Sequence, residues 1–169
     1  MSNALLALTV VKRLKLDLER ALESLKTIPQ TPMRFERVTI GDCMWINDAY
    51  NASMDSMIGA VETIVGISEK PPWIIFGDVF ECGDQGSLIH TQIGDKLNQF
   101  PLKGVVFIGH AMVHSYNAYI GNKFYFVTVE EALVELPAIL SRASSILVKA
   151  SRGMALERIL KHFQELIND

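Results

Sequence analysis

The fold of this chain is decided by the stretch Asn47-Asp48-Ala49-Tyr50-Asn51-Ala52-Ser53-Met54-Asp55-Ser56-Met57. An apolar run, Met44-Trp45-Ile46, precedes it and is typical of the end of a buried strand. Apolar residues then recur at helical spacing from Ser56 to Ile67. The stretch therefore predicts a turn from a strand into a helix. Open α/β sheets bind ligands at the carboxyl ends of their strands, so this crowd of polar side chains favours a polar ligand.

Past residue 31 the chain alternates short apolar runs with helical patterns. Gly41-Asp42 predicts a hairpin between the first two runs, and Thr128 with Glu131 has the spacing of a capping box. Strands are expected at residues 35–40, 43–47, 73–76, 105–108, 124–127 and 145–148, and helices at 53–67, 87–100, 112–119, from Thr128 and from Ser151. This alternation predicts a Rossmann-like α/β fold, in which a mostly parallel sheet carries helices on both faces.

The first part of the chain has a different pattern. Residues 1–28 predict two amphipathic helices, the second of them capped by Asp17. Two prolines in Pro29-Gln30-Thr31-Pro32 break any helix and predict a linker. We therefore expect a short helical part, residues 1–31, followed by an α/β domain, residues 32–169.

Composition narrows the function classes. The 169 residues carry a formal net charge of −3 and no basic stripe, which argues against a nucleic-acid partner. The apolar runs are too short to span a bilayer, and no signal-peptide pattern is present, so a cytoplasmic protein is expected. Cys43 and Cys82 fit a reduced compartment and are interpreted as small core residues.

Several strands are followed directly by polar residues. These strand ends are Asn47-Asp48, Gly77-Asp78, Gly109-His110 and Lys149-Ala150-Ser151. In a parallel sheet they share one edge, so their side chains are expected to converge on one rim. Lys149, Ser151 and Arg152 could form an anion site at the start of the last helix, with Ser151 as its cap. The alternative is an ordinary capped helix with solvated bases, but a lysine directly after Ile-Leu-Val requires a partner.

The remaining rim residues each have two interpretations. Asp48 could bind a sugar hydroxyl or could be a turn aspartate bonded to local backbone. Tyr50 could stack on a ligand ring or pack in the core, and Asn51 could bind a ligand carboxylate or belong to a turn.

The acidic residues and histidines have alternatives as well. Asp78, Glu81 and Asp84 could pair with an ammonium group, although a solvated loop is favoured for Asp84. His90 is interpreted as a structural histidine. His110 and His114 have helical spacing but no evident third ligand, which argues against zinc.

At these residues the chain resembles the C-terminal domain of the Mur ligases. The stretches that carry the resemblance are Pro32-Met33-Arg34-Phe35-Glu36, Asn47 to Ala52 with Asp55-Ser56-Met57, Gly77-Asp78-Val79-Phe80-Glu81-Cys82-Gly83 with His90, and Lys149-Ala150-Ser151-Arg152 with Glu157. Three positions depart from the family pattern. Met33 and Ala150 replace glycines, and Ser53-Met54 replaces Asn-Pro. The alanine could narrow the backbone approach to a ligand.

The resemblance implies ATP-dependent amide ligation, most closely the addition of D-Ala-D-Ala to a UDP-MurNAc-tripeptide in peptidoglycan synthesis. It implies that residues 1–31 are the closing helices of a central ATPase domain, and that the P-loop and the Mg²⁺ ligands belong to that domain. No catalytic or metal-binding residue is expected in this chain, which is expected to be monomeric and inactive alone. The ATP-binding residues implied are Arg34, Asp48 and Lys149, and the substrate-binding residues implied are Tyr50, Asn51, Asp78, Ser151 and Arg152.

Two alternatives remain open. One is a stand-alone α/β module that binds a small ligand or signals, although such a module has no need of the helices before residue 32. The other is a Mur-ligase relative with another amino substrate, such as a polyglutamate-forming ligase, and the Asn-Ala pair after Tyr50 argues against it.

Overall fold

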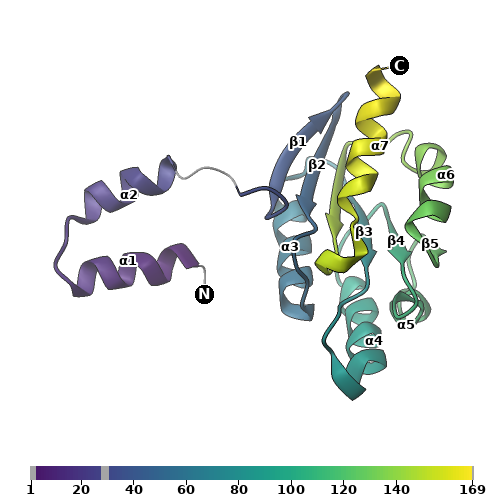
Figure 1. The fold of residues 1–169 in the computed structure, drawn as a ribbon, viewed down its shortest axis with the longest axis horizontal. Helices are drawn as coiled ribbons and strands as arrows, with labels where there is room; N and C mark the ends of the chain where they lie inside the picture. The colour runs from purple at the N-terminus through teal and green to yellow at the C-terminus, as the bar shows by residue number, and fades with distance from the viewer. Residues whose placement is uncertain (1–2, 28–30, 169) are drawn as a thin grey trace. The chain divides into compact units, whose positions relative to one another are not determined.

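The computed structural model describes residues 3–27 and 31–168, and it divides the chain into two compact units, residues 1–31 and 32–169. The first unit holds helices α1 (Asn3–Arg13) and α2 (Leu18–Lys26) (Figure 1). Asp17 caps α2 as predicted, because its carboxylate accepts a hydrogen bond from Arg20 N at 3.0 Å. The linker predicted at Pro29 and Gln30 lies outside the described residues.

The second unit is built on a six-stranded sheet with the order β1-β2-β6-β3-β4-β5. Its strands are β1 (Glu36–Ile40), β2 (Cys43–Asp48), β3 (Trp73–Gly77), β4 (Gly104–Ile108), β5 (Lys123–Phe126) and β6 (Ser145–Lys149). β1 pairs antiparallel with β2 across the predicted hairpin, where Gly41 has a φ of 58°. All other neighbours in the sheet are parallel. The prediction of a mostly parallel α/β sheet is therefore confirmed.

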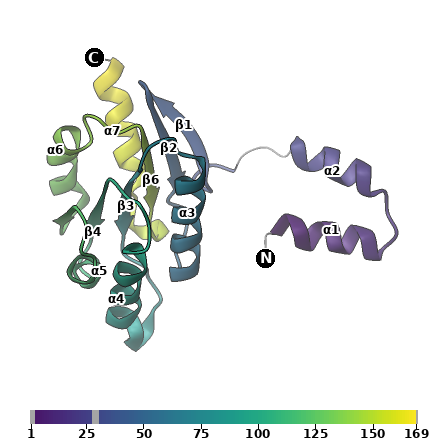
Figure 2. The same ribbon diagram turned by 180° about the vertical axis from the view of Figure 1, so that it is seen from behind.

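Helices cover both faces of this sheet. They are α3 (Met54–Ile67), α4 (Gly86–Leu97), α5 (Met112–Ala118), α6 (Val129–Ile139) and α7 (Glu157–Asn168). α3, α4 and α5 pack on one face, with Met57, Ile64 and Ile93 in its apolar cluster. α6 and α7 pack on the other face, toward the viewer in Figure 1 and behind the sheet in Figure 2.

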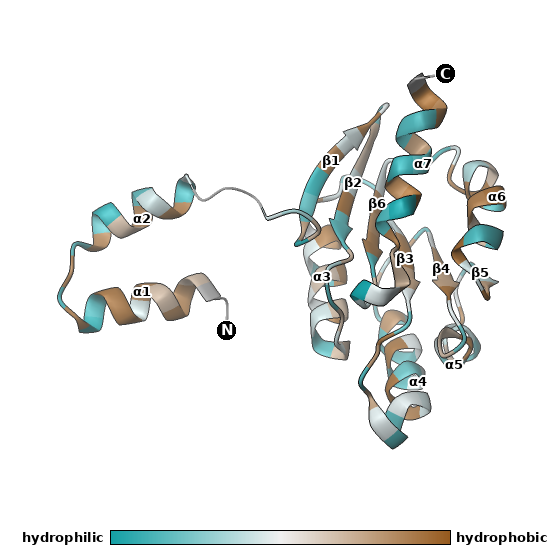
Figure 3. Ribbon diagram, viewed as in Figure 1, coloured by the Kyte–Doolittle hydropathy of each residue, from teal (hydrophilic) through white to brown (hydrophobic). Residues whose placement is uncertain are grey.

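The central strands are apolar along nearly their whole length (Figure 3), since both of their sides are buried. This explains why these strands appear in the sequence as continuous apolar runs rather than alternating ones. β6 enters the sheet between β2 and β3, so the last strand in the chain lies near the sheet centre. Among the described residues no helix is long and apolar enough to cross a membrane.

Local sequence signals set two of the helix starts. Ser53 and Ser56 form a capping box at α3, and Thr128 and Glu131 form the predicted one at α6.

Where α4 and α5 pack together, Gly94 allows a very close approach. A Cβ atom at that position would lie 2.3 Å from the backbone oxygen of Ser115.

The predicted start of the last helix at Ser151 is wrong. The segment after β6 forms a short 3₁₀ turn, η2 (Arg152–Met154), and passes through Ala155 at a φ of 51° before α7 begins at Glu157. Ser151 does not cap η2 with its side chain. Its hydroxyl oxygen instead accepts a hydrogen bond from Phe80 N at 2.8 Å, which binds the β6 end to the loop after β3.

Candidate functional site

The ends of the central parallel strands meet at one rim of the sheet, as their sequence pattern predicts. The register between β2 and β6 places Asp48 beside Lys149, and the register between β6 and β3 places Lys149 beside Phe76. The polar residues that follow β2, β6 and β3 are therefore neighbours, although they lie far apart in the sequence.

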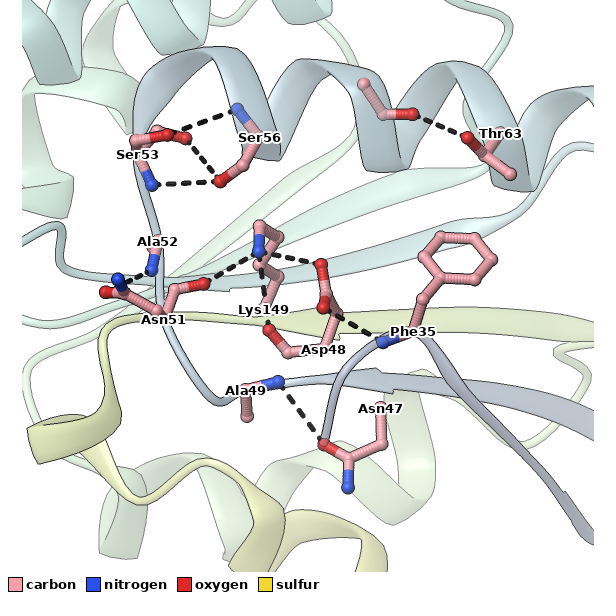
Figure 4. Close-up of polar contacts among 11 residues, drawn as sticks. Phe35, Asn47, Asp48, Ala49, Asn51, Ala52, Ser53, Ser56, Thr63 and Lys149 are labelled. Atoms are coloured by element: carbon pink, nitrogen blue, oxygen red, sulfur yellow. Dashed lines mark hydrogen bonds and ion pairs between the residues drawn. The ribbon is translucent and has the colours of Figure 1, made fainter. Parts of the chain in front are cut away.

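A buried ion pair lies at the centre of this rim (Figure 4). The Nζ atom of Lys149 lies 2.7 Å from Oδ2 of Asp48, and the two side chains are only 3% and 17% exposed. The same Nζ donates a hydrogen bond to the backbone oxygen of Asn51 at 2.8 Å. The partner that Lys149 needs after three apolar residues is thus Asp48, within the chain, rather than an external anion.

Asp48 also holds the chain that enters β1. Its Oδ1 atom accepts a hydrogen bond from Phe35 N at 2.9 Å (Figure 4). The neighbouring residue, Arg34, is exposed, and its guanidinium lies 4.1 Å from the centre of the Tyr50 ring. The structure therefore brings Arg34, Asp48, Tyr50 and Lys149 together.

A pocket of about 630 Å³ opens beside the ion pair. Three segments form it, and they are residues 51–54 after β2, residues 79–82 with Ile89, and residues 151–153 after β6. Met54, Val79 and Phe80 give it apolar walls, while Ser151 gives it a hydroxyl, Arg152 a cation and Glu81 a carboxylate. Such a lining suits a small ligand that has both apolar groups and a carboxylate.

Arg152 links this pocket to two other parts of the structure. Its Nη1 lies 2.6 Å from Oε1 of Glu157 and 3.4 Å from the sulfur of Met33. The arginine side chain is 53% exposed and borders both this pocket and a smaller hollow of about 320 Å³, which is also lined by Met33 and Glu157. Ala150, at the position where the resemblance implies a glycine, is fully buried against Gly77 and does not line the pocket.

Asp78 has a different orientation from the one its sequence position suggested. The side chain is buried, and its Oδ1 accepts a hydrogen bond from Met112 N, at the start of α5, at 2.9 Å. Gly109, at a φ of 121°, gives it room, because a Cβ there would lie 2.5 Å from the carboxylate. Asp78 is not among the residues lining the pocket, so its position favours a structural role over substrate binding. Glu81 and Asp84 are exposed.

His90 is a structural histidine, as predicted. It is 1% exposed, and its Nε2 accepts a hydrogen bond from Val79 N at 3.1 Å while its Nδ1 lies 2.7 Å from the backbone oxygen of Gly86. The neutral ring with its proton on Nδ1 satisfies both contacts. His90 thus fixes the loop that carries Phe80 into the pocket.

The two cysteines are free and partly buried. Cys43 packs against the cluster under α6 and α7, and burial raises the pKa of its thiol to about 11. Cys82 lines the pocket and lies 3.3 Å from the backbone oxygen of Val79. Within residues 3–27 and 31–168, no group of three or more His, Cys, Asp or Glu side chains could hold a metal ion.

Several pocket residues and one residue that supports the rim are not predicted from the sequence. Met54, Phe80 and Gly153 line the pocket, and all three lie next to residues that the sequence had singled out. Glu36 was not assigned a role, yet its Oε2 accepts hydrogen bonds from Met33 N and from Asn47 Nδ2. The one sequence signal for such a role is the position of Glu36 two residues after Arg34, in a stretch that carries the family resemblance.

The family model described as "Mur ligase, glutamate ligase domain" matches residues 33–152, which include every strand end of the rim. The chain belongs to this Mur ligase family. It is 30% identical over 174 aligned residues to the UDP-N-acetylmuramoyl-tripeptide–D-alanyl-D-alanine ligase of Bacillus subtilis, covering 96% of this chain and 37% of that protein. The Escherichia coli ligase of the same name is 24% identical, with 97% of this chain and 36% of that protein covered.

Solved structures of Mur ligases share the fold. MurF from Acinetobacter baumannii superimposes with a TM-score of 0.88 at 24% identity, over 96% of this chain and 36% of that one. MurF ligase from Thermotoga maritima in complex with ADP gives a TM-score of 0.79 at 21% identity, over 95% of this chain and 36% of that one. The chain thus spans little more than a third of the length of the relatives that it matches.

Proposed function

We propose that this chain is the C-terminal part of an ATP-dependent ligase that joins D-Ala-D-Ala to a UDP-MurNAc-tripeptide in the cytoplasm. The observation that carries the proposal is the pocket beside the Asp48–Lys149 ion pair, in a chain of the Mur ligase family. Residues 1–31 would be the closing helices of the central ATPase domain. The Bacillus subtilis relative, by its name, adds D-alanyl-D-alanine, and it aligns with 96% of this chain.

The nucleotide would lie on the outer side of the rim. Arg34 is exposed there and carries a charge that suits a phosphate, and Asp48 can accept a hydrogen bond from a ribose hydroxyl. Lys149 is too enclosed for direct contact with ATP, so its part is to hold the carboxylate of Asp48 in place. Tyr50, under the guanidinium of Arg34, fixes the direction of that side chain.

The dipeptide would occupy the pocket. Its carboxylate would bind Arg152 and the hydroxyl of Ser151, and its two methyl groups would pack against Met54 and Phe80. Asn51 lines the same pocket and lies next to the ion pair through its backbone oxygen. We leave Asp78 out of this set because its carboxylate faces α5.

The reaction would follow the route that the family implies. The tripeptide carboxylate attacks the γ-phosphorus of ATP, which releases ADP and forms an acyl phosphate. The amine of the dipeptide then attacks the acyl carbon, loses a proton, and phosphate leaves. This chain would orient the amine and the nucleotide and exclude water from the acyl phosphate. We assign Mg²⁺ and the phosphate cradle to the rest of the ligase, because the described residues hold no metal-ligand cluster and the sequence has no P-loop.

A ligand titration followed by ¹H–¹⁵N NMR tests the pocket. D-Ala-D-Ala should shift the amide signals of Phe80, Ser151 and Gly153 saturably, with a dissociation constant on the order of 1 mM because only part of the site is present. L-Ala-L-Ala and L-glutamate are the matched controls and should shift them less. Arg152→Ala should abolish the response. Equal responses to L-glutamate and D-Ala-D-Ala would contradict the assignment of the amino substrate.

An activity assay tests the division of labour. The chain alone should neither hydrolyse ATP nor form an amide bond, because its sequence lacks the Gly-x-x-x-x-Gly-Lys-Ser/Thr motif that cradles phosphates. Clear ATP turnover that Asp48→Ala abolished would overturn the proposal that the phosphate site lies elsewhere. The proposed state of the chain is monomeric, and light scattering checks it.

A further inference from the structure

The segment that carries Arg34 is held in a strained conformation. The residues on either side of it, Met33 and Phe35, have φ values of 58° and 52°. Side chains with a Cβ rarely adopt this left-handed region, and glycine is the usual residue there. Two such residues around one arginine do not persist without support, so surrounding contacts must impose the conformation.

Two carboxylates supply that support. Oε2 of Glu36 accepts a hydrogen bond from Met33 N at 2.9 Å, and Oδ1 of Asp48 accepts one from Phe35 N at 2.9 Å. The backbone amides directly before and after Arg34 are therefore both held by acidic side chains. The backbone oxygen of Met33 is held as well, since it accepts a hydrogen bond from Tyr50 N at 3.1 Å.

Glu36 is itself anchored to the sheet. It begins β1 and pairs in register with Asn47 of β2. The amide nitrogen Nδ2 of Asn47 donates a hydrogen bond to the same Oε2 atom at 3.1 Å, which fixes the carboxylate that Met33 N also contacts. The carboxylate thus transmits the position of the β1–β2 hairpin to the backbone before Arg34.

We propose that Glu36 is a positioning residue that fixes the direction of the Arg34 guanidinium on the rim. The inference rests on the proposed function in so far as Arg34 is assigned to ATP. Glu36 acts through backbone hydrogen bonds, because a carboxylate next to a triphosphate would repel it. The geometry that Glu36 would maintain is the stacking of Arg34 on Tyr50, in which the guanidinium lies 4.1 Å from the centre of the ring.

The first readout is the Nε–Hε signal of Arg34 in the ¹H–¹⁵N spectrum of the full chain, which the Tyr50 ring current displaces. Glu36→Ala should return this signal toward the position of a free arginine, and Tyr50→Leu, which removes the ring, should do the same. Glu36→Gln keeps an oxygen that can accept both hydrogen bonds and should preserve the signal. Glu62→Ala, which removes an exposed glutamate of α3, is the control and should change nothing.

The second readout is ATP affinity, measured by titrating the same chain with ATP. Glu36→Ala should weaken binding about tenfold, close to the loss caused by Arg34→Ala, because one charge-assisted hydrogen bond is misplaced. Glu36→Gln should stay within about twofold of the wild-type value. In the Arg34→Ala background, Glu36→Ala should have no further effect, which a merely structural role would not predict.

The outcomes separate this inference from the function it rests on. If Arg34→Ala leaves ATP affinity unchanged, the assignment of Arg34 to ATP is wrong. The Nε–Hε signal of Arg34 in the Glu36 variants still tests the positioning in that case. Should Glu36→Ala fail to fold in a thermal melt, Glu36→Asp, which retracts the carboxylate by one methylene, takes its place. Wild-type values of both readouts in the folded variant would overturn the role of Glu36.

Discussion

The two units of this chain use similar helical patterns to very different effect. In α1 and α2 several large aliphatic side chains stay open to solvent, with Leu5, Leu6 and Leu22 between 44% and 56% exposed. In the second unit the aliphatic residues of the helices pack against the sheet and form a continuous apolar cluster on each of its faces. Hydrophobic periodicity therefore predicts where a helix forms, but it does not identify the surface that covers it. A pair of helices of this length buries too little area to provide that surface itself.

The ion pairs of the two units show the same contrast. Lys26 lies 2.6 Å from Glu23 on α2, and both side chains are 70% exposed. Lys149 lies 2.7 Å from Asp48, and both are nearly enclosed. The two distances hardly differ, so burial decides what each pair contributes to stability.

The largest expected effect comes from breaking the buried pair. Lys149→Ala leaves the carboxylate of Asp48 buried without its partner and should lower the free energy of unfolding by about 3–5 kcal/mol. Urea unfolding followed by tryptophan fluorescence measures this, since Trp45 and Trp73 both lie in the second unit. Lys26→Ala is the matched control; because the first unit holds no tryptophan, its unfolding is followed by the circular dichroism of its helices, and the loss should be no more than roughly 0.2–1 kcal/mol. Equal losses in the two variants would contradict the contrast drawn from burial.

The apolar side chains give the next largest effect. Ile64 is fully buried under the sheet, and Ile64→Ala should lower the free energy of unfolding by about 2–5 kcal/mol through lost contacts and a residual cavity. Leu22 is 44% exposed on α2, and Leu22→Ala should change the same transition by less than roughly 0.5 kcal/mol. A loss above 2 kcal/mol for Leu22→Ala would contradict the exposure of this side chain.

The reactivity of the Cys43 thiol tests whether this side chain, near the edge of the sheet in the second unit, is buried. Its thiol pKa is raised from 9.0 to about 11 by burial, so at pH 8 its reactive thiolate should be about a hundredfold rarer than in an unfolded chain. Iodoacetamide labelling of the Cys82→Ser variant, folded and in urea, measures the ratio. The folded rate should keep rising as the pH increases toward 11. A plateau near pH 9 would contradict the burial of this thiol.

The smallest expected effect comes from backbone strain at a single residue of each unit. Met33 has a φ of 58°, and Met33→Gly should raise the free energy of unfolding by about 0.5 kcal/mol, since the left-handed penalty of ~1–2 kcal/mol exceeds the entropy cost of glycine. Lys15, between α1 and α2, has a φ of 55°. Lys15→Gly should leave the tryptophan transition unchanged. A destabilised Met33→Gly would mean that the methionine side chain contributes more than its backbone strain costs.

Much of the fold could be predicted because its signals are local. The caps at Asp17 and Thr128 follow from side chains that reach backbone amides three residues away. The apolar strands and their polar ends follow from the burial of both faces of a parallel sheet. The convergence of Asp48 and Lys149 on one rim follows from the same rule, without knowledge of the strand order.

The remainder depended on contacts that no local pattern encodes. The partner of Lys149 could not be named, because Asp48 lies 101 residues away and becomes a neighbour only when β6 enters between β2 and β3. Ser151 was predicted to cap a helix because serine commonly does so. Its hydroxyl oxygen instead accepts a hydrogen bond from Phe80 N, 71 residues away. Asp78 could not be placed because its orientation depends on the room beside Gly109.

The central position of β6 also determines when the molecule can assemble. β2 and β3 have no pairing with each other, and each must wait for β6 on its inner edge. On a ribosome, residues 36–126 emerge before β6, so five strands are made before the one that joins β2 to the rest of the sheet. Their edges stay open until then, and such edges invite pairing with other chains. Folding should therefore be slow and complete only after β6 is synthesised, which makes this interval the time of greatest aggregation risk for the protein.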